Sequence, residues 1–195
     1  ITWDRFIEIG EAVFKKTGVA WCAYDPTDGG LVRVMLQSAG SWYFTRDGKA
    51  NLAGNKVMEA AVSTYAKLIA SPATMKTSGW SEWVGSINSG KAASISTGVW
   101  IIGSVKAEAT QSGKWAVAPI PRLNVAGSVN ASNLGGSSWY VLNASKAKDT
   151  AIAFLNDTYG KDTEFYQKIL VERGAVGTFA PSQSGSAYTS ADPFF

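Results

Sequence analysis

The sequence predicts an α/β fold, and three observations support this. Short apolar runs, such as the one ending at Tyr24, alternate with longer amphipathic segments, as they do in βα units. Residues that favour turns, mainly Gly, Pro, Asp and Asn, separate these segments. The chain has 195 residues, 46% of them hydrophobic and 17% charged, so it can bury a substantial core.

The first half is predicted to contain a helix over residues 3–17, a strand over 19–24, a helix over 31–39, a turn at 46–49 and helices over 56–70 and 82–89. Thr2, Asn55 and Ser81 are suitable N-caps for three of these helices. Gly18 is typical of a helix C-terminus, because glycine adopts the left-handed conformation found there. The apolar stripe of the 56–70 helix, which comprises Val57, Ala61, Tyr65, Leu68 and Ile69, is predicted to be buried.

The second half begins with residues 89–104, which read as a turn, a short strand and a glycine-containing loop that presents Trp100 where a helix begins. Further strands are predicted over 114–119 and 139–143, and further helices over 147–159 and 163–173. Pro119 and Pro121 should end the first of these strands, because proline donates no ladder hydrogen bond. No internal repeat is present.

Composition disfavours several classes of function. The chain has no histidine and one cysteine, Cys22, which lies in an apolar run, so we predict neither a metal site nor any other cofactor. The net charge of +3 comes from scattered basic residues, so a nucleic-acid partner is not expected. No apolar stretch approaches the roughly 20 residues that span a bilayer.

The strongest candidate for ligand binding is Trp100. In open α/β sheets, ligands bind beyond the carboxyl ends of the strands, and an indole is a flat apolar surface with one N–H donor, suited to a neutral sugar. The loop after the first predicted strand adds Asp25 and Asp28, whose carboxylates could accept hydrogen bonds from sugar hydroxyls. The structural alternatives are that Trp100 starts a packed helix and that Asp25 or Thr27 caps one.

Gly135 and Gly136 precede the strand predicted at 139–143, where glycine allows a ligand to approach the backbone closely or simply forms a turn. Trp80 and Trp83, three residues apart on a short helix, are interpreted as core residues. Support for catalysis is weak, because there is no Gly-x-Ser-x-Gly motif and no histidine to activate a serine. A glycosidase pair, such as Asp25 with Glu82, stays open.

Seven segments, taken in order, resemble the extracellular solute-binding proteins of carbohydrate ABC transporters. They are residues 2–6 (Thr-Trp-Asp-Arg-Phe), 60–68, 87–100, 115–121 (Trp-Ala-Val-Ala-Pro-Ile-Pro), 135–143 (Gly-Gly-Ser-Ser-Trp-Tyr-Val-Leu-Asn), 151–155 and 174–181. The resemblance implies a periplasmic-binding-protein-like (type II) fold with two α/β lobes joined by a hinge. It further implies that this chain is a fragment: residues 1–122 in the second lobe, 123–185 crossing the hinge into the first, and 186–195 returning toward the hinge.

The same resemblance implies a function without catalysis, in which a sugar or oligosaccharide is captured between the lobes and delivered to a membrane permease. The implied location is the periplasm or the extracellular face of the membrane, with a lipid anchor. By position, the residues implied to contact ligand are Trp100, Tyr24, Asp25, Thr27, Asp28, Gly135, Gly136 and Ser137. Alternatives are a glycoside hydrolase lobe, a binding protein for another solute and a structural adhesion module. Self-association of the fragment is also expected, because a severed lobe exposes apolar surface.

Overall fold

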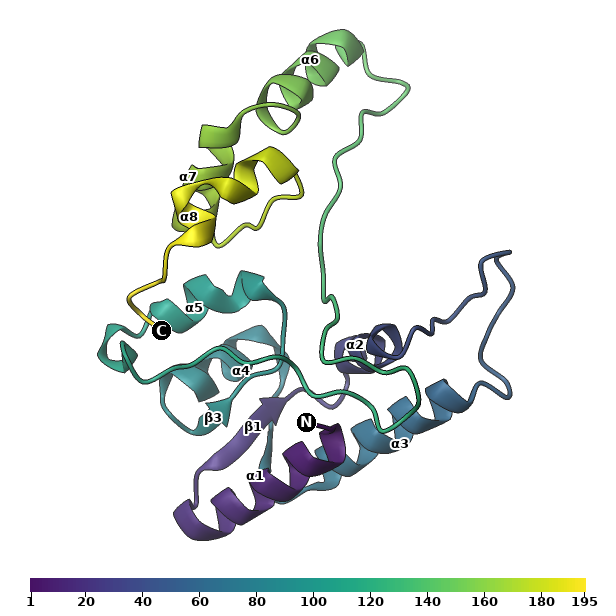
Figure 1. The fold of residues 1–195 in the computed structure, drawn as a ribbon, viewed down its shortest axis with the longest axis vertical. Helices are drawn as coiled ribbons and strands as arrows, with labels where there is room; N and C mark the ends of the chain where they lie inside the picture. Colours follow the sequence, from purple (N-terminus) through teal and green to yellow (C-terminus); the bar gives the residue numbers. More distant parts are fainter. The chain divides into compact units, whose positions relative to one another are not determined.

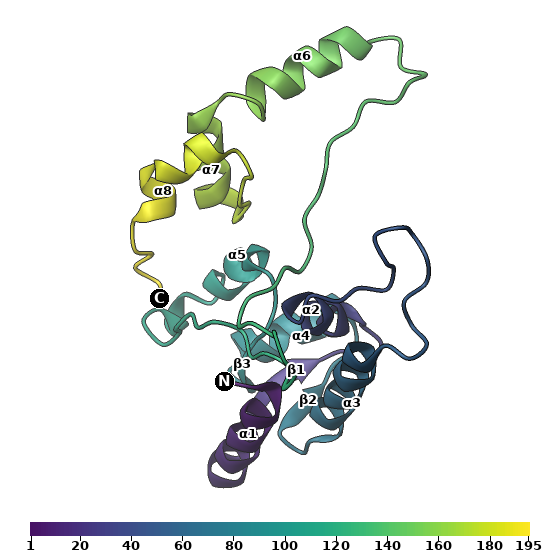
Figure 2. The same cartoon turned by 45° about the vertical axis from the view of Figure 1, so that its right-hand side comes forward.

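The computed structural model describes all residues from 1 to 195 and contains two compact units. The first unit comprises Ile1–Gly98 and Val117–Leu134, and the second comprises Val99–Ala116 and Gly135–Phe195. Figures 1 and 2 show the elements of both. No helix is long and apolar enough to cross a bilayer.

The first unit is built around a three-stranded parallel sheet with the order β2-β1-β3. Its elements are α1 (Trp3–Thr17), β1 (Ala20–Tyr24), α2 (Gly30–Ser38), α3 (Lys56–Ala70), β2 (Thr74–Lys76), α4 (Gly79–Asn88) and β3 (Ala92–Ser94). Cys22 of β1 pairs with Thr74 on one side and Ser94 on the other. Because the strands are parallel, Tyr24, Lys76 and Ser94 end at one edge of the sheet.

The helices of this unit begin and end largely where the sequence predicts. The Thr2 hydroxyl accepts from Arg5 N, Asn55 Oδ1 accepts from Val57 N and Met58 N, and Gly18 closes α1 with a φ of 74°. The exception is α4, which starts at Gly79 rather than at residue 82, with Ser78 rather than Ser81 in the cap position. The reason is a tertiary contact, because Gly79 N donates a hydrogen bond to Asp25 in the loop after β1.

The core of the first unit combines residues from α1, β1, α2 and α3 with one from the later segment, Leu123. Trp3, Met35 and Leu36 are almost completely buried within it. In Figure 2, α1 and α3 lie beside the strands, and α4 contacts β1 and β3. Val129 N donates to Ser38 O and Ser132 Oγ to Val34 O, so the 117–134 segment packs against α2.

The second unit is helical. It contains η1 (Val99–Ile101), α5 (Ile102–Lys106), η2 (Ala109–Gln111), α6 (Lys148–Thr158), α7 (Thr163–Arg173), η3 (Ala180–Ser184) and α8 (Ser186–Thr189). The helices predicted over 147–159 and 163–173 are therefore present, with Asp162 capping α7 and Gly174 ending it at a φ of 64°. An aromatic group that includes Tyr159 and Tyr166 packs between α6 and α7.

Two predicted strands are absent, at 114–119 and at 139–143. A strand is stabilised only when a neighbouring strand completes its hydrogen bonds, and neither segment pairs with another. Their apolar side chains face solvent instead: Val117, Trp139 and Tyr140 are 80%, 67% and 81% exposed. The α/β class is confirmed as a mixed fold with a small parallel sheet, in which fewer strands form than the sequence pattern indicates.

Candidate functional site

The loop that follows β1 is held together by its own carboxylates. Asp25 Oδ1 accepts hydrogen bonds from Thr27 N at 2.9 Å and Thr27 Oγ1 at 2.6 Å. Asp28 Oδ1 accepts from Gly30 N at 2.7 Å and so supports the start of α2. Pro26, Thr27 and Asp28 are exposed. The alternative that Asp25 or Thr27 caps the helix that follows is wrong, because Gly29 occupies the N-cap position of α2. Asp25 and Thr27 order the turn instead.

Asp25 also connects two loops that are far apart in the sequence. Its second oxygen, Oδ2, accepts from Gly79 N at 2.9 Å, which fixes the first residue of α4. These hydrogen bonds, with that from the Thr27 hydroxyl as the largest cause, lower the pKa of Asp25. The Asp25 carboxylate is thus ionised near neutral pH, and it already accepts three hydrogen bonds from the protein.

Tyr65 of α3 supports the same loop from the other side. Its hydroxyl lies 3.2 Å from Asp25 O and 3.1 Å from Asp28 O, to which it donates. Partial burial, followed by the charges of Asp28 and Asp25, raises the pKa of Tyr65, so the phenol keeps its proton. The loop after β1 is consequently fixed to α3 as well as to α4.

Tyr24, the last residue of β1, lies in the core with 7% of its surface exposed. Burial is the main cause that raises the pKa of this phenol, which stays neutral. Within the first unit, the exposed members of the predicted ligand set are therefore Thr27 and Asp28, with Asp25 partly exposed.

In the second unit, Trp100 lies in the single 3₁₀ turn that precedes α5 and is 38% exposed. It is not sealed among helices, as the packed-helix alternative would require. Its neighbour Ile101, only 6% exposed, takes the buried position instead. The sequence predicts that Trp100 lies on a loop where a helix begins, and the structure places it in the turn before α5.

Gly135 lies against the indole of Trp100. A Cβ built on Gly135 would stand 3.1 Å from Trp100 Nε1 and 3.6 Å from Cδ1. Gly135 and Gly136 have φ values of 92° and 106°, which are strained for residues other than glycine. Glycine therefore satisfies two needs here, an unusual backbone conformation and a close approach to Trp100. The structure brings two of the predicted residues, Trp100 and Gly135, together, with Gly136 and Ser137 following in an exposed segment.

A second glycine, Gly174 at the end of α7, lies close to the backbone of the same turn. A Cβ built there would stand 3.8 Å from Trp100 O and from Gly103 N. The Trp100 turn is thus flanked by two glycine positions from distant parts of the chain, Gly135 and Gly174.

Trp80 is the residue that sequence reasoning missed. It was interpreted as core, yet it is 53% exposed, at the second position of α4 and beyond the carboxyl end of β2. Its helical spacing from Trp83 suggested a shared buried face. The strand that precedes it, β2, is not among the predicted strands, so the position of Trp80 beyond a carboxyl strand end was not apparent from the sequence.

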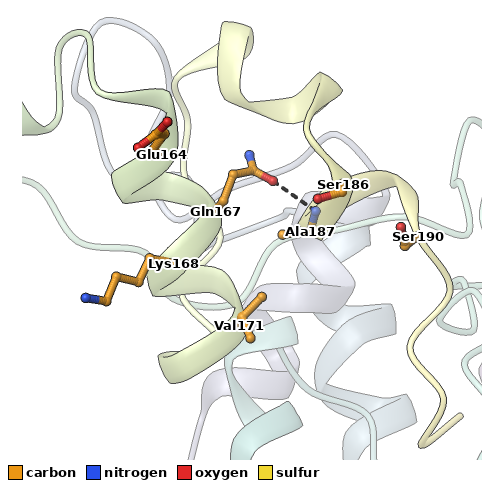
Figure 3. A pocket seen from close by; sticks show the side chains of 7 residues that line it. All are labelled: Glu164, Gln167, Lys168, Val171, Ser186, Ala187 and Ser190. Carbon is orange, nitrogen blue, oxygen red and sulfur yellow. Dashed lines mark hydrogen bonds between the residues drawn. The ribbon is translucent and has the colours of Figure 1, made fainter.

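Away from these loops, the second unit has an open groove between α7 and α8 (Figure 3). Gln167 spans it: Gln167 Nε2 donates to Ser182 O at 2.6 Å, and Gln167 Oε1 accepts from Ala187 N at 2.9 Å. Because both ends of the amide are used within the protein, Gln167 joins the C-terminal segment to α7. Nowhere do three or more Asp, Glu or Cys side chains gather in a way that could hold a metal ion.

Comparison of the sequence with known proteins identifies its family. Residues 1–193 match a family model described as bacterial extracellular solute-binding protein. The chain is 52% identical over its 195 residues to a protein from Rhizobium radiobacter named lactose-binding protein. It spans 46% of the length of that relative. No solved structure matches the chain significantly. Since the family model covers almost every residue, the chain belongs to the bacterial extracellular solute-binding proteins.

Proposed function

We propose that this chain is part of the substrate-binding component of an ABC transporter, which captures a neutral sugar outside the cytoplasm and delivers it to a membrane permease. Lactose is the first candidate ligand, because the relative that is 52% identical carries the name lactose-binding protein. Family membership supports a periplasmic or extracellular location. A lipid anchor of the full-length protein is part of the proposal.

The observation that carries this proposal is the pairing of Trp100 with Gly135. A partly exposed indole next to a glycine backbone offers a sugar both an apolar surface and main-chain hydrogen-bonding groups. We propose Trp100, Gly135, Gly136 and Ser137 as ligand contacts from the second unit. Thr27 and Asp28 are proposed as contacts from the first, while Asp25 and Tyr24 are proposed as members of the same site that support it from within the protein.

The two-lobe assignment is proposed with the boundaries given above: residues 1–122 in the second lobe, 123–185 crossing into the first and 186–195 returning. The unpaired apolar segment at 139–143 supports a larger fold, since Trp139 and Tyr140 would be buried if the segment were a strand of a sheet covered by helices on both faces. The compact units divide the chain at other points, after residues 98, 116 and 134, so they do not set these boundaries.

The proposed physical event is hinge closure. Contacts that a sugar makes only in the closed form shift an existing equilibrium between open and closed forms. An indole excludes water from the apolar face of a sugar ring, and carboxylates and amides replace the water that its hydroxyls lose. No covalent bond changes.

The lowered pKa of Asp25, the candidate general acid, argues against a glycosidase. A general acid for glycoside hydrolysis needs a raised pKa, whereas hydrogen bonds from Thr27 and Gly79 lower that of Asp25. Its possible partner, Glu82, accepts a hydrogen bond from Ser78 N at 2.7 Å and so supports the start of α4.

The test is isothermal titration calorimetry of the full-length protein against lactose, galactose, maltose and glucose. We expect saturable binding of at least one sugar and no release of monosaccharide from lactose after prolonged incubation. Binding of none of these sugars, or steady turnover of lactose, would overturn the proposed function.

A further inference from the structure

Trp80 presents an aromatic side chain at the edge of the sheet where the loops after β1 and β2 meet. It lies four residues after Lys76, the last residue of β2, and more than half of its surface is exposed. An exposed indole at this edge is available to a ligand, because ligands of open parallel sheets bind beyond the carboxyl ends of the strands. Two sets of contacts hold the segment that carries Trp80.

The first contact is with Trp83, one helical turn along α4. The two ring centroids are 5.5 Å apart with an interplanar angle of 61°, an edge-on arrangement. Trp83 is itself fixed, because its Nε1 donates to Ala23 O of β1 at 2.9 Å. The Trp80 ring therefore rests against a side chain that is attached to the central strand.

The second contact is through Asp25. Gly79, the residue immediately before Trp80, has a φ of 70° and donates its backbone N–H to Asp25 Oδ2. Asp25 is in turn held by Thr27, and its carbonyl oxygen accepts from the Tyr65 hydroxyl. The position of Trp80 is thus set by the loop after β1, which is part of the proposed sugar site.

We propose that Trp80 is a second aromatic contact for the sugar and that Asp25 is a positioning residue that acts through it. The inference rests on the proposed function and deepens it. An exposed indole fits the apolar C–H face of a neutral pyranose, and a carboxylate that already accepts three hydrogen bonds has little capacity left for sugar hydroxyls.

The experiment measures lactose affinity by calorimetry for Trp80→Ala, Trp80→Leu and Trp80→Phe in the full-length protein. We expect dissociation constants about tenfold or more higher for the Ala and Leu variants, and within about threefold of the unaltered protein for Phe. The Leu variant keeps an apolar side chain without a ring, so it separates loss of stacking on the sugar from loss of packing within the protein. It also replaces the Ala variant in the experiment if that variant does not fold.

The matched control is Trp42→Ala. Trp42 is also partly exposed, at 37%, and also contacts an aromatic neighbour, Tyr43, but it lies in the loop between α2 and α3. The Trp42→Ala variant should bind lactose with the same affinity as the unaltered protein. Trp80→Leu with unaltered affinity, in a protein whose parent binds lactose, overturns this inference alone. Failure of the parent protein to bind any sugar overturns the proposed function, and this inference with it.

A double-mutant cycle tests the role of Asp25. If Asp25 acts through Trp80, Asp25→Ala weakens lactose binding in the parent protein and changes it by less than about twofold in the Trp80→Ala background. If the fold-changes in dissociation constant of the two single variants multiply in the double variant, Asp25 contacts the sugar directly. That result would overturn the positioning role.

Discussion

At the scale of single residues, the binding surface proposed here depends on how a few side chains are presented. In the short helical turn, Trp100 is 38% exposed, whereas its neighbour Ile101 is buried. Asp25 is partly exposed, yet hydrogen bonds within the protein occupy most of its carboxylate. An aspartate in a loop that is predicted to bind ligand can therefore serve to hold the loop in shape.

Trp100→Ala in the full-length protein should weaken sugar binding by about 1 to 3 kcal/mol, the range expected for an aromatic side chain that covers a ligand. Calorimetry measures the effect. A circular dichroism spectrum identical to that of the unaltered protein is the control for folding. An unchanged affinity would remove Trp100 from the site.

Gly135→Ala should also weaken binding, because an added Cβ would crowd Trp100 Nε1 at 3.1 Å and the residue would have to keep a φ of 92°. The matched control is Gly127→Ala, which has a similar φ of 76° but open space around it. We expect calorimetry to show the larger loss for position 135. Equal affinities for the two variants would argue against a functional contact between Gly135 and Trp100.

The pH dependence of stability follows from the lowered pKa of Asp25, which hydrogen bonds from Thr27 and Gly79 cause. A carboxyl with a lower pKa in the folded state stabilises that state above its unfolded pKa, about 3.9, and this stabilisation is lost as pH falls through the folded pKa. Asp25→Asn should therefore lower the melting temperature at pH 7 and make its fall below about pH 4 shallower.

Thermal melts of the two proteins between pH 7 and pH 3 measure this effect. The acidic slope should not vanish, because hydrogen bonds also lower the pKa values of Asp47, Glu108 and Asp192. Parallel curves for the two proteins across the whole range would show that Asp25 has no part in the linkage.

At the scale of elements, helix α1 packs closely on β1. A Cβ on Gly10 would lie 2.4 Å from Trp21 Cδ1, and Trp21 also contacts Phe6 with a centroid distance of 5.3 Å. Small size at position 10 is therefore a packing requirement, since a larger residue would push α1 away from the strand.

Gly10→Ala should lower the free energy of unfolding by about 1 to 3 kcal/mol, as overpacking does in other cores. Denaturation by urea measures this change. Gly85→Ala, inside α4 with open space around it, is the control and should be neutral or stabilising by up to about 1 kcal/mol, because alanine favours helix over glycine. The opposite order of the two variants would contradict the packing role.

Elements with local signals formed where the sequence predicts them. Helix caps act within one or two turns of chain, so the ends of a helix can be predicted from neighbouring residues. The caps of this kind are Thr2, Asn55 and Asp162 at helix starts and Gly18 and Gly174 at helix ends. The start of α4 could not be predicted in this way. It depends on Asp25, 54 residues before Gly79.

At the scale of the whole molecule, the second unit leaves many apolar side chains in contact with solvent. Trp139, Tyr140 and Leu142 are each at least 66% exposed, and α6 has no buried residue. Exposed apolar surface of this kind favours association.

The 195-residue chain, expressed alone, should therefore self-associate in a concentration-dependent manner. Sedimentation velocity measures the change in the sedimentation coefficient between low and high micromolar concentrations. A variant that carries Trp139→Ser, Tyr140→Ser and Leu142→Ser should associate less. If both proteins remain monomeric over this range, the exposed segment is not an association surface.

The sequence by itself determined the helices, the central strand, the parallel α/β character and the presentation of Trp100, because helix caps, glycines and apolar periodicity act over short distances. The tertiary structure decided which predicted strands form, since 114–119 and 139–143 lack partners. It also decided that Trp80 is exposed and that Asp25 binds Gly79. Those outcomes depend on contacts between residues distant in the chain, which no local pattern encodes.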